Sequence, residues 1–549
     1  MRTMLATLLT LSATVAPAAL NAQSVAPPQI PVETLKTVTK TLSSDEYGGR
    51  APGTEGAEKT IAYITKRFQE AGLKPGNHGK WTQDVPLVEI TAQDVQPLTF
   101  TGGKQPLSFD YRNDMVVATY RVTPKINLEN SDVVFVGYGI NAPERGWNDY
   151  AGVDVKGKTV VILVNDPDWQ QSDLKGTFNG REMTYYGRWT YKYEEAARQG
   201  AAAAIIVHQT EPAAYGWNVV QSSWTGPQLE QDTPGDHMDQ SKAIGWIQLD
   251  AAKQLFASAG KDFAALSAAA GKKGFHAVPL GVEASTSFVN TIRRQASKNV
   301  VGILPGTKRP DEVVLYSAHW DHLGHCDPVD GDDICNGAAD NASGIAGLVA
   351  LAEANAEAGA TARSQVFLAV TAEESGLLGS KYYAENPVYP LAKTVGGVNM
   401  DVLNLIGPTK DFVITGIGKS ELEDLVKPLV AAQNRVIKPE SHPEAGHYYR
   451  SDHFSFAKLG VPMLSAGSGI DLVDGGTAAG KKAEDDYTAN RYHQPSDEYD
   501  PNWNWQGAVQ DLQIYYQLGR ELADSDRWPN WYQGTEFRAV RDKSRAAVQ

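Results

Sequence analysis

The chain has 549 residues, which exceeds what one hydrophobic core normally serves, so we expect two folded units. Its hydrophobic fraction of 42% and charged fraction of 21% are ordinary for a soluble globular protein, and they exclude wholesale disorder or a bundle of membrane helices. The net charge of -15 argues against nucleic acid or an anionic membrane surface as a partner, because each requires a basic face.

The N-terminal residues have the layout of a secretory signal peptide. A basic start precedes an apolar stretch from Met4 to Leu20 and small residues up to Ala22. We therefore predict a signal peptide over 1–22 and an exported protein, periplasmic or secreted; a buried N-terminal helix is the alternative. Because no later stretch is long and apolar enough to span a bilayer, we expect no membrane anchor.

The segment 23–115 contains a predicted helix and a connection. Apolar side chains recur at helical spacing between 57 and 72, and Gly72 ends the run. The stretch from about 87 to 109 is polar with scattered apolar residues. We interpret it as irregular structure or short strands that connect two units.

Residues 116–281 form a predicted insert domain. Short β-rich runs begin at Val133, Thr159 and Ala203, and a helix is predicted from Trp189 to Gln199. The segment contains no cluster of metal-binding or nucleophilic residues. We therefore expect the chemistry of the protein to lie elsewhere.

From Asn299 onward strands alternate with helices, which predicts an α/β three-layer sandwich with a mostly parallel central sheet. The predicted strands are 300–304, 313–317, 366–371, 395–400 and 461–466. A helix is predicted over 343–358, and Gly359 ends it. We expect 282–549 to complete the domain that begins in 23–115.

Two cysteines, Cys326 and Cys335, lie nine positions apart in a Gly/Asp-rich loop. In an oxidising compartment this pair predicts a disulfide. A metal-binding thiol pair is the alternative, although two thiols without a second pair make a poor zinc site. Calcium is another possible ligand of the loop, although its acidic residues lack the EF-hand spacing. These acids are Asp327, Asp330, Asp332 and Asp333.

Charged side chains follow the predicted strands at the points where each strand ends. Ligands of open α/β sheets gather at the carboxyl ends of the strands, so these residues are candidates for a site. A further candidate begins the helix at 343–358, and the last arrives much later in the chain. They are His319 and Asp321, Glu373 and Glu374, Asp401, then Asp340, then His493.

Converging acids at strand ends cost several kcal/mol to desolvate unless something pairs them. Few cations are nearby, and a mixture of imidazole and carboxylate without sulfur favours zinc over magnesium or calcium. Two metals require more acids than one, and the count is sufficient. Singly, each residue has an ordinary structural explanation, such as Asp340 as a helix N-cap, but their conjunction favours a metal site.

These motifs resemble those of the co-catalytic di-zinc exopeptidase family, which includes secreted bacterial aminopeptidases and glutamate-carboxypeptidase-like enzymes. The matching motifs are Ser317-Ala-His-Trp-Asp-His, Ala339-Asp-Asn-Ala-Ser-Gly, Ala372-Glu-Glu-Ser-Gly-Leu-Leu-Gly-Ser, Asn399-Met-Asp and Tyr492-His-Gln-Pro-Ser-Asp. The likeness extends to Ser43-Ser-Asp-Glu-Tyr-Gly-Gly-Arg-Ala-Pro-Gly. Residues 133–209 resemble the protease-associated insert domain of some members.

The resemblance implies two zinc ions per chain and a role for each candidate. His319 and Asp401 would bind one zinc, Glu374 and His493 the other, and Asp340 both. Asp321 would orient the imidazole of His319 by accepting its other N–H. Glu373 is the implied general base and Tyr492 the implied donor to the oxyanion. The resemblance also implies a cis peptide bond between Asp340 and Asn341.

The chemistry of the residues agrees with these roles. Zinc lowers the pKa of bound water to about 7, so a neighbouring carboxylate can take its proton and pass it to the leaving amine. Adjacent side chains of an extended segment point opposite ways, so Glu374 can bind metal while Glu373 faces the substrate. Tyr492 can stabilise the oxyanion.

For peptide substrates, the sequence favours an aminopeptidase over a carboxypeptidase. A carboxypeptidase requires arginines for a terminal carboxylate, and Arg450 is the one cation in a segment that the family places near the pocket. Two roles stay open for Arg450: binding of a carboxylate, or an ion pair with Asp452. The alternatives are a carboxypeptidase of the glutamate-carboxypeptidase type, a binding protein without metals on the same fold, and a single-zinc glutaminyl cyclase. A substrate-gating lid is our hypothesis for the insert.

Overall fold

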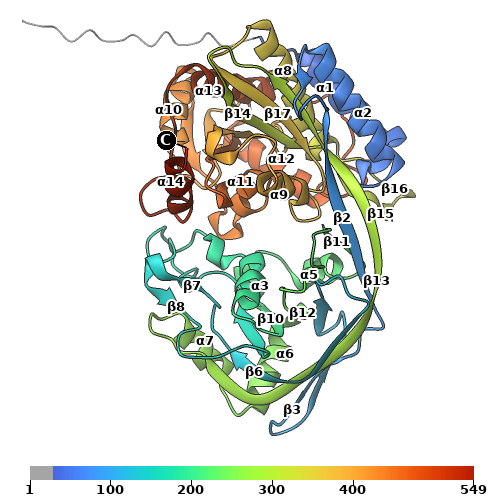
Figure 1. Cartoon of the computed structure of the whole chain (residues 1–549), viewed down its shortest axis with the longest axis vertical. Helices are drawn as coiled ribbons and strands as arrows, with labels where there is room; N and C mark the ends of the chain where they lie inside the picture. The colour runs from blue at the N-terminus through green and yellow to red at the C-terminus, as the bar shows by residue number, and fades with distance from the viewer. Residues whose placement is uncertain (1–28, 549) are drawn as a thin grey trace, which may run out of the picture.

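The computed structural model describes residues 29–548, and Figure 1 shows them as two lobes. One lobe holds the N-terminal helices and the C-terminal half of the chain, and the other holds most of the segment between. The antiparallel strands β2 (Thr82–Gln93) and β13 (Val278–Leu304) pass from one lobe to the other. The signal peptide predicted for 1–22 lies outside the described residues.

The first lobe is built on a mostly parallel sheet, as the sequence predicts. Its central strands follow the order β13, β17, β14, β18, β21, and only the β13–β17 pair among them is antiparallel. The four parallel strands are β14 (Arg309–His319), β17 (Arg363–Val370), β18 (Thr394–Asn399) and β21 (Met463–Ser468).

Helices cover both faces of this sheet. Successive residues of β14 alternate between two cores: Val314 and Tyr316 lie in one, Val313 and Leu315 in the other. Strands buried on both faces have nearly continuous apolar sequences, which explains why they could be predicted. Helices α9 (Leu378–Glu385) and α11 (His453–Lys458) cover one face. The other is covered by α1 (Val32–Leu42), α2 (Glu55–Glu70), α8 (Gly344–Glu357), α10 (Leu422–Ala432) and α13 (Gln506–Asp524).

Smaller elements complete the first lobe. The disulfide between Cys326 and Cys335 is confirmed, and it lies in the hairpin of β15 and β16. The remaining elements are β15 (Gly324–Val329), β16 (Asp332–Cys335), β19 (Asp411–Ile414), β20 (Val436–Pro439), α12 (Gly476–Asn490) and α14 (Arg538–Ala546). No helix of residues 29–548 has the length and apolar character that crossing a membrane requires.

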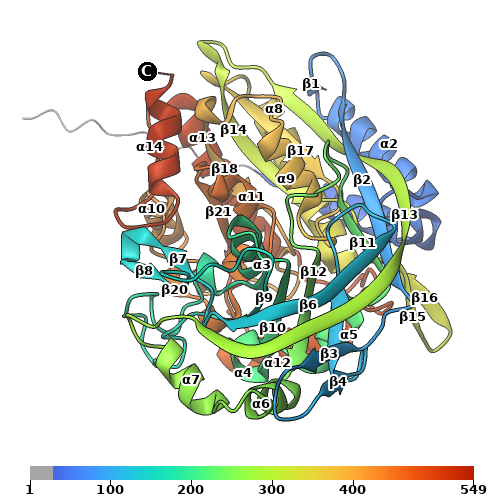
Figure 2. The same cartoon turned by 60° about the horizontal axis from the view of Figure 1, so that its bottom comes forward.

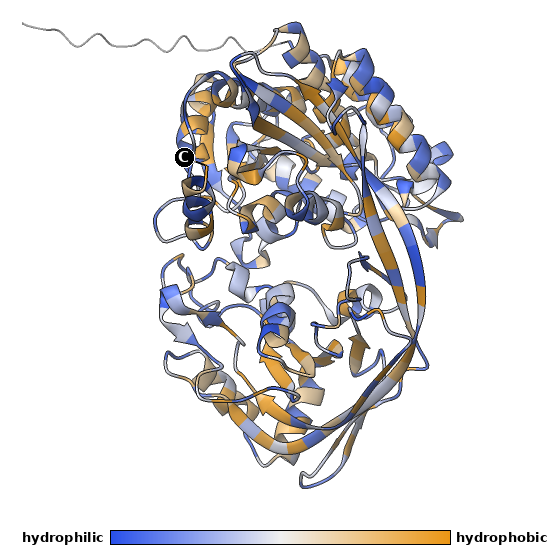
Figure 3. Cartoon of the chain, in the orientation of Figure 1, coloured by the Kyte–Doolittle hydropathy of each residue, from blue (hydrophilic) through white to orange (hydrophobic). Residues whose placement is uncertain are grey.

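The second lobe has its own sheet and cores. Strands β6, β9, β10 and β12 are parallel in that order, and β5 pairs antiparallel with β12. Apolar residues colour these strands strongly in Figure 3, and they pack into a core on each face. The elements are β5 (Met115–Ala118), β6 (Lys125–Phe135), β9 (Thr159–Leu163), β10 (Ala203–His208), β12 (Ala243–Gln248), α3 (Trp189–Arg198) and α6 (Leu249–Ser258).

The chain passes between the lobes along continuous strands. The predicted boundaries at 115/116 and 281/282 fall within β5 and β13, and the predicted connection at 87–109 begins inside β2. Residues 289–296 of β13 include no buried side chain, whereas the paired strand β2 buries Val85, Leu87 and Ile90. The division into domains therefore stays a prediction.

Candidate metal centre

The residues proposed from the sequence converge at the carboxyl edge of the parallel sheet. His319 is the last residue of β14, while Glu373 and Glu374 follow the end of β17 and Asp401 follows the end of β18. The carboxyl ends of parallel strands meet at one edge, so three separate segments of chain bring their side chains together there. Figure 2 shows these strands beneath the helices of the first lobe.

Asp340 reaches the same place from the segment Ala338–Ser343, which leads directly into α8. The peptide bond between Asp340 and Asn341 is cis, as the resemblance implies. The buried carboxylate of Asp497 accepts hydrogen bonds from the amides of Ala339 and Asp340, each at 3.1 Å. Asp497 belongs to a motif noted in the sequence, but its role as an anchor of this segment was not predicted.

The carboxylate of Asp340 lies between two imidazoles. Its Oδ1 is 3.2 Å from Nε2 of His319, and its Oδ2 is 3.5 Å from Nε2 of His493. Nε2 of His319 is also 3.1 Å from Asp401, and Nε2 of His493 is 3.1 Å from Glu374. The structure thus brings together two pairs of imidazole and acid that share one carboxylate.

His322 also faces this cluster and was given no role from the sequence. Its Nδ1 lies 2.6 Å from Oε1 of Glu374, and ligand atoms of His322, Asp340 and Glu374 lie within 4.8 Å of one another. The available signal was its position in Ser317-Ala-His-Trp-Asp-His, three residues after His319. Gly337 passes so close that a Cβ there would be 2.5 Å from the His322 ring, so a glycine is required.

Asp321 positions the backbone that carries the two glutamates. Its carboxylate accepts hydrogen bonds from the amides of Glu373 at 3.1 Å and Glu374 at 3.4 Å. Nδ1 of His319 lies 3.2 Å from the backbone carbonyl oxygen of Asp321 and 3.8 Å from its carboxylate. The carboxylate of Asp321 therefore holds the backbone of Glu373 and Glu374, while the hydrogen bond predicted from His319 reaches the backbone carbonyl of Asp321 and not its carboxylate.

The side chain of Tyr492 lies over His493. The two rings are stacked with their centroids 3.9 Å apart, and the Tyr492 side chain remains 45% exposed. The phenol ring is thus held against the imidazole, and part of the side chain stays accessible from solvent. Its role as a donor stays a prediction.

The pKa values of the two adjacent glutamates, Glu373 and Glu374, shift in opposite directions. Burial raises the pKa of Glu373 well above its ordinary value, although His319 opposes the shift. Burial also acts to raise the pKa of Glu374, but His322 and His493 lower it to about 2. Burial lowers the pKa of the His319 imidazole, yet Glu373 and Asp401 hold it well above its usual range. Glu373 is thus the carboxylate of this pair with the higher proton affinity.

The buried Arg50 holds the backbone of the loops that carry the cluster. The guanidinium of Arg50 donates to the carbonyls of Trp320 at 2.8 Å, Asn336 at 2.6 Å and Gly337 at 2.8 Å, and also to Leu42. Burial lowers the pKa of Arg50 to about 10, against the effect of nearby carboxylates, so it stays charged at neutral pH. These bonds connect the N-terminal segment to the loops that carry His319 and Asp340.

The donor set fits a divalent cation. Within residues 29–548, Nε2 of His322 is a buried atom without a hydrogen-bond partner, while Oδ1 of Asp340 and Nε2 of His493 have only the ion-pair contacts given above and no hydrogen bond. Buried polar atoms are rarely left unpartnered unless they bind something. Imidazoles and carboxylates without sulfur match the ligands of zinc in hydrolytic sites.

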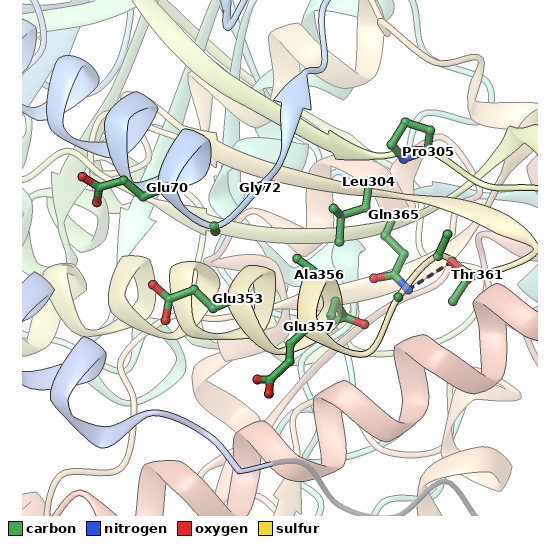
Figure 4. A pocket seen from close by; sticks show the side chains of 13 residues that line it. Glu70, Gly72, Leu304, Pro305, Glu353, Ala356, Glu357, Thr361 and Gln365 are labelled. Carbon is green, nitrogen blue, oxygen red and sulfur yellow. Dashed lines mark hydrogen bonds between the residues drawn. The ribbon is translucent and has the colours of Figure 1, made fainter.

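A separate surface cavity lies at the other end of α8, shown in Figure 4. It has a volume of ~530 Å³ and is lined by the C-terminal turns of α2 and α8 together with the end of β13, including Leu304 and Thr361. At 1.5 Å per residue, the length of α8 puts this cavity about 20 Å from Asp340. None of the predicted site residues lines it.

Comparison with known sequences places this site within a family. Residues 299–517, which span all five of the predicted ligands, match Peptidase family M28. This region belongs to peptidase family M28. The M28 region contains the four parallel strands of the first lobe, and the resemblance of the motifs in this region is confirmed. The resemblance of residues 133–209 to a protease-associated insert stays a prediction.

The similar proteins match different shares of this chain. The solved aminopeptidase from Aneurinibacillus sp. strain AM-1 has a TM-score of 0.50 at 20% identity, covering 91% of this chain and 96% of that one, and shows the shared fold. Mouse Aminopeptidase NAALADL1 is 32% identical over 130 residues, which are 23% of this chain and 16% of the relative. A probable zinc metalloprotease of Pyricularia oryzae is 36% identical over 105 residues, 19% of this chain and 20% of the relative.

Proposed function

We propose that the protein is a zinc-dependent exopeptidase, specifically an aminopeptidase that hydrolyses the N-terminal bond of peptides. The observation that carries this proposal is the carboxylate of Asp340 between His319 and His493, with the carboxylate of Glu373 4.0 Å from Nε2 of His319. Membership of peptidase family M28 and the names of the relatives support it.

Two zinc ions would be held by the paired ligands. His319 and Asp401 would bind one, Glu374 and His493 the other, and Asp340 both. The 2.6 Å contact between His322 and Glu374 would fix the orientation of that carboxylate. When bound, zinc polarises a peptide carbonyl and lowers the pKa of water.

Glu373 would act as the general base. Burial raises its proton affinity, so it can accept a proton from water and donate it to the leaving amine. The hydrogen bond from its amide to Asp321 holds it in position. Tyr492, stacked on His493, would donate a hydrogen bond to the oxyanion that develops on the substrate.

The excess of carboxylates supports an aminopeptidase, because a protonated α-amine requires acids near the cleaved bond. Asp452 is buried, and neither of its carboxylate oxygens has a hydrogen-bond partner among the side chains that the structure describes. Burial raises its pKa to about 7, against the charge of His319. The preceding residue, Ser451, accepts a hydrogen bond of 2.8 Å from Asn399, the last residue of β18, so this segment lies at the carboxyl edge of the sheet. An ammonium group of the substrate would pair with such an acid.

The predicted location and insert belong to the same proposal. The disulfide of Cys326 and Cys335 supports an exported protein, because disulfides persist in oxidising compartments. We propose that the second lobe is the protease-associated insert and covers the site as a lid. Deletion of 116–281 without a change in substrate preference would contradict the lid.

The decisive test is an assay of aminoacyl-anilides and N-blocked peptides, with and without chelator, together with metal analysis. We expect chelator-sensitive release of N-terminal residues and about two zinc ions per chain. Cleavage of N-blocked peptides at their carboxyl ends would show a carboxypeptidase instead. One zinc per chain would favour the cyclase, and bound metal without any hydrolysis would favour a binding protein.

A further inference from the structure

The cavity at the C-terminal end of α8 lies apart from the metal centre and has the size of a small-molecule site. Its volume is ~530 Å³, within the range of about 300–1,000 Å³ that such sites have. The last turns of α2 and α8 meet there, since a Cβ at Gly72 would lie 4.0 Å from the Cβ of Ala356. Each helix C-terminus carries a partial negative charge, so this place favours a cation.

The charged side chains that line the cavity are all acidic. They are Glu70, Glu353 and Glu357, and no lysine, arginine or histidine is among the lining residues. Arg67 lies 3.2 Å from Glu70 and 2.9 Å from Glu353, and the exposed Lys66 lies 3.7 Å from Glu70. Glu357 has no ion-pair partner within residues 29–548. The cavity therefore has an excess of negative charge at its rim.

A buried amide adds an unused acceptor to this lining. Gln365 of β17 is only 1% exposed, and Figure 4 shows its side chain between Leu304 and the last turn of α8. Its Nε2 donates to Oγ1 of Thr361 at 3.3 Å, and that hydroxyl donates its own hydrogen to the carbonyl of Arg363 at 2.7 Å.

These two hydrogen bonds fix the orientation of the Gln365 amide. The hydroxyl of Thr361 has no second hydrogen to donate, so the nitrogen of the amide must face it and the oxygen must face away. Oε1 of Gln365 is left buried, without a hydrogen-bond partner in the part of the chain that the structure describes. A buried acceptor without a donor is rare in a folded protein and indicates a missing ligand.

The other walls of the cavity are largely apolar. They include Ala71, Leu304, Pro305, Ala356 and Ala360. A carbon chain would pack against these walls, while an ammonium group, which carries three donors and no acceptor, matches the acceptors. A ligand with a carboxylate would face acids without a basic residue in the lining, so anions and free amino acids do not fit.

We propose that this cavity binds a small aliphatic diamine or polyamine. One ammonium group donates to Oε1 of Gln365, a second lies near the carboxylate of Glu357, and the carbon chain packs on Leu304 and Pro305. Hydrogen bonds from a charged donor are the stronger kind, so the buried acceptor contributes most to binding. The site goes beyond the proposed function and does not depend on it, because none of the metal-centre residues lines the cavity.

The test is calorimetric binding of 1,4-diaminobutane to the metal-loaded protein at low ionic strength, where salt screens the charges least. We expect saturable binding of a single diamine per chain and no binding of 1,4-butanediol, which has the same carbon chain without charge. Gln365→Met keeps an unbranched side chain but removes the acceptor. It should weaken diamine binding by about 10- to 100-fold, as loss of a hydrogen bond to a charged group does.

Two exposed positions keep the test decisive if Gln365→Met does not fold. Glu357→Gln removes the unpaired carboxylate and should weaken binding by about two- to fivefold, as expected for an exposed ion pair. Ala360→Phe fills the cavity from its rim and should abolish binding. Glu385→Gln, a change of an exposed glutamate on α9 that does not line the cavity, is the matched control and should bind as the wild type does.

The metal centre is a competing site for an amine, and a further variant separates the two. Glu373→Gln should bind 1,4-diaminobutane with wild-type affinity, because the cavity lies about 20 Å from Asp340. Diamine binding that disappears in Glu373→Gln or after chelation, and is unchanged in Gln365→Met and Ala360→Phe, would place the amine at the metal centre and overturn the proposal. Equal affinity for 1,4-butanediol would also overturn it, since charge would then play no part.

Discussion

Both lobes bury a cluster of charged side chains, and the two clusters differ in how their charges are satisfied. In the second lobe, the fully buried Lys192 lies with Asp149 and Asp166. Its Nζ donates to the backbone carbonyls of Tyr138 at 2.6 Å and Asn165 at 3.0 Å. Burial lowers the pKa of Lys192 to about 7 and raises that of Asp166 to about 7. Burial thus disfavours the charged form of each group, and the opposite charge of the other group stabilises it.

The acids of the second-lobe cluster are also bonded. Asp166 accepts two hydrogen bonds from Thr184, at 2.6 and 2.9 Å. Asp149 accepts from the amide of Ile140 at 3.0 Å and from the indole of Trp147 at 2.8 Å. The metal centre instead leaves buried ligand atoms without partners. The difference teaches that a buried charge cluster with satisfied groups supports the fold, whereas one with open groups marks a binding site.

The largest effect that tests this difference between the two buried clusters is expected at Glu373. Glu373→Gln should lower kcat by about 10²- to 10⁴-fold, because the amide cannot accept the proton that a general base must take. Zinc content should stay unchanged, since Glu373 is not among the proposed ligands. Glu385→Gln, a substitution of an exposed glutamate, is the control. A Glu373→Gln enzyme with near wild-type turnover would remove this residue as the base.

In the second lobe the same kind of change should affect stability instead of turnover. Lys192→Met removes a buried cation that donates to two backbone carbonyls and whose charge acts on two buried acids, so it should lower the free energy of unfolding by about 3–5 kcal/mol. Denaturant unfolding measures the loss, and Lys156→Met on the surface is the control. Adding Asp166→Asn should restore part of the stability. A catalytic defect in Lys192→Met without lost stability would contradict the purely structural role.

The parallel sheet and the ligands at the ends of its strands could be predicted because the sequence of each strand shows them by itself. Strands such as β14 and β17 are buried on both faces and so have continuous apolar sequences. The residue after such a run lies at the carboxyl edge whatever the rest of the fold does. Three of the five ligand candidates, His319, Glu374 and Asp401, were found in this way. Asp340 came from a helix start and His493 from a motif late in the chain, and the structure brings all five together.

Other features depend on contacts that no local pattern reveals. In β13 the residues 289–296 between the lobes include no buried side chain, so the full length of this strand could not be inferred from apolar periodicity. Asp497 accepts hydrogen bonds from the backbone amides of Ala339 and Asp340. Every residue except proline has such an amide, so the side chains of these partners gave no signal in the sequence. Arg181 pairs with Glu444 at 2.9 Å only because the second lobe packs on the first.

Removal of metal should affect the two clusters unequally. With zinc at 100 to 1,000 times its dissociation constant, chelation should cost the first lobe about 3–4 kcal/mol. Amide hydrogen exchange should accelerate in 338–343 and 399–403 and stay unchanged in β9 and β10. Equal acceleration in both lobes would mean that the second lobe depends on the metal centre for its stability.

The smallest effect is expected at Arg50, the bonded cation behind the open cluster. Its guanidinium reaches four carbonyl oxygens at once. Arg50→Lys retains the positive charge, but a single ammonium cannot span the four acceptors, so we expect a loss of about 1–3 kcal/mol in unfolding free energy. Arg67→Lys, which can keep the ion pair with Glu353, is the matched control. If only the charge of Arg50 mattered, Arg50→Lys and Arg67→Lys would be equally stable. If the hydrogen bonds of Arg50 hold the loops of His319 and Asp340, Arg50→Lys should also weaken zinc binding. Competition with a chelator measures that binding.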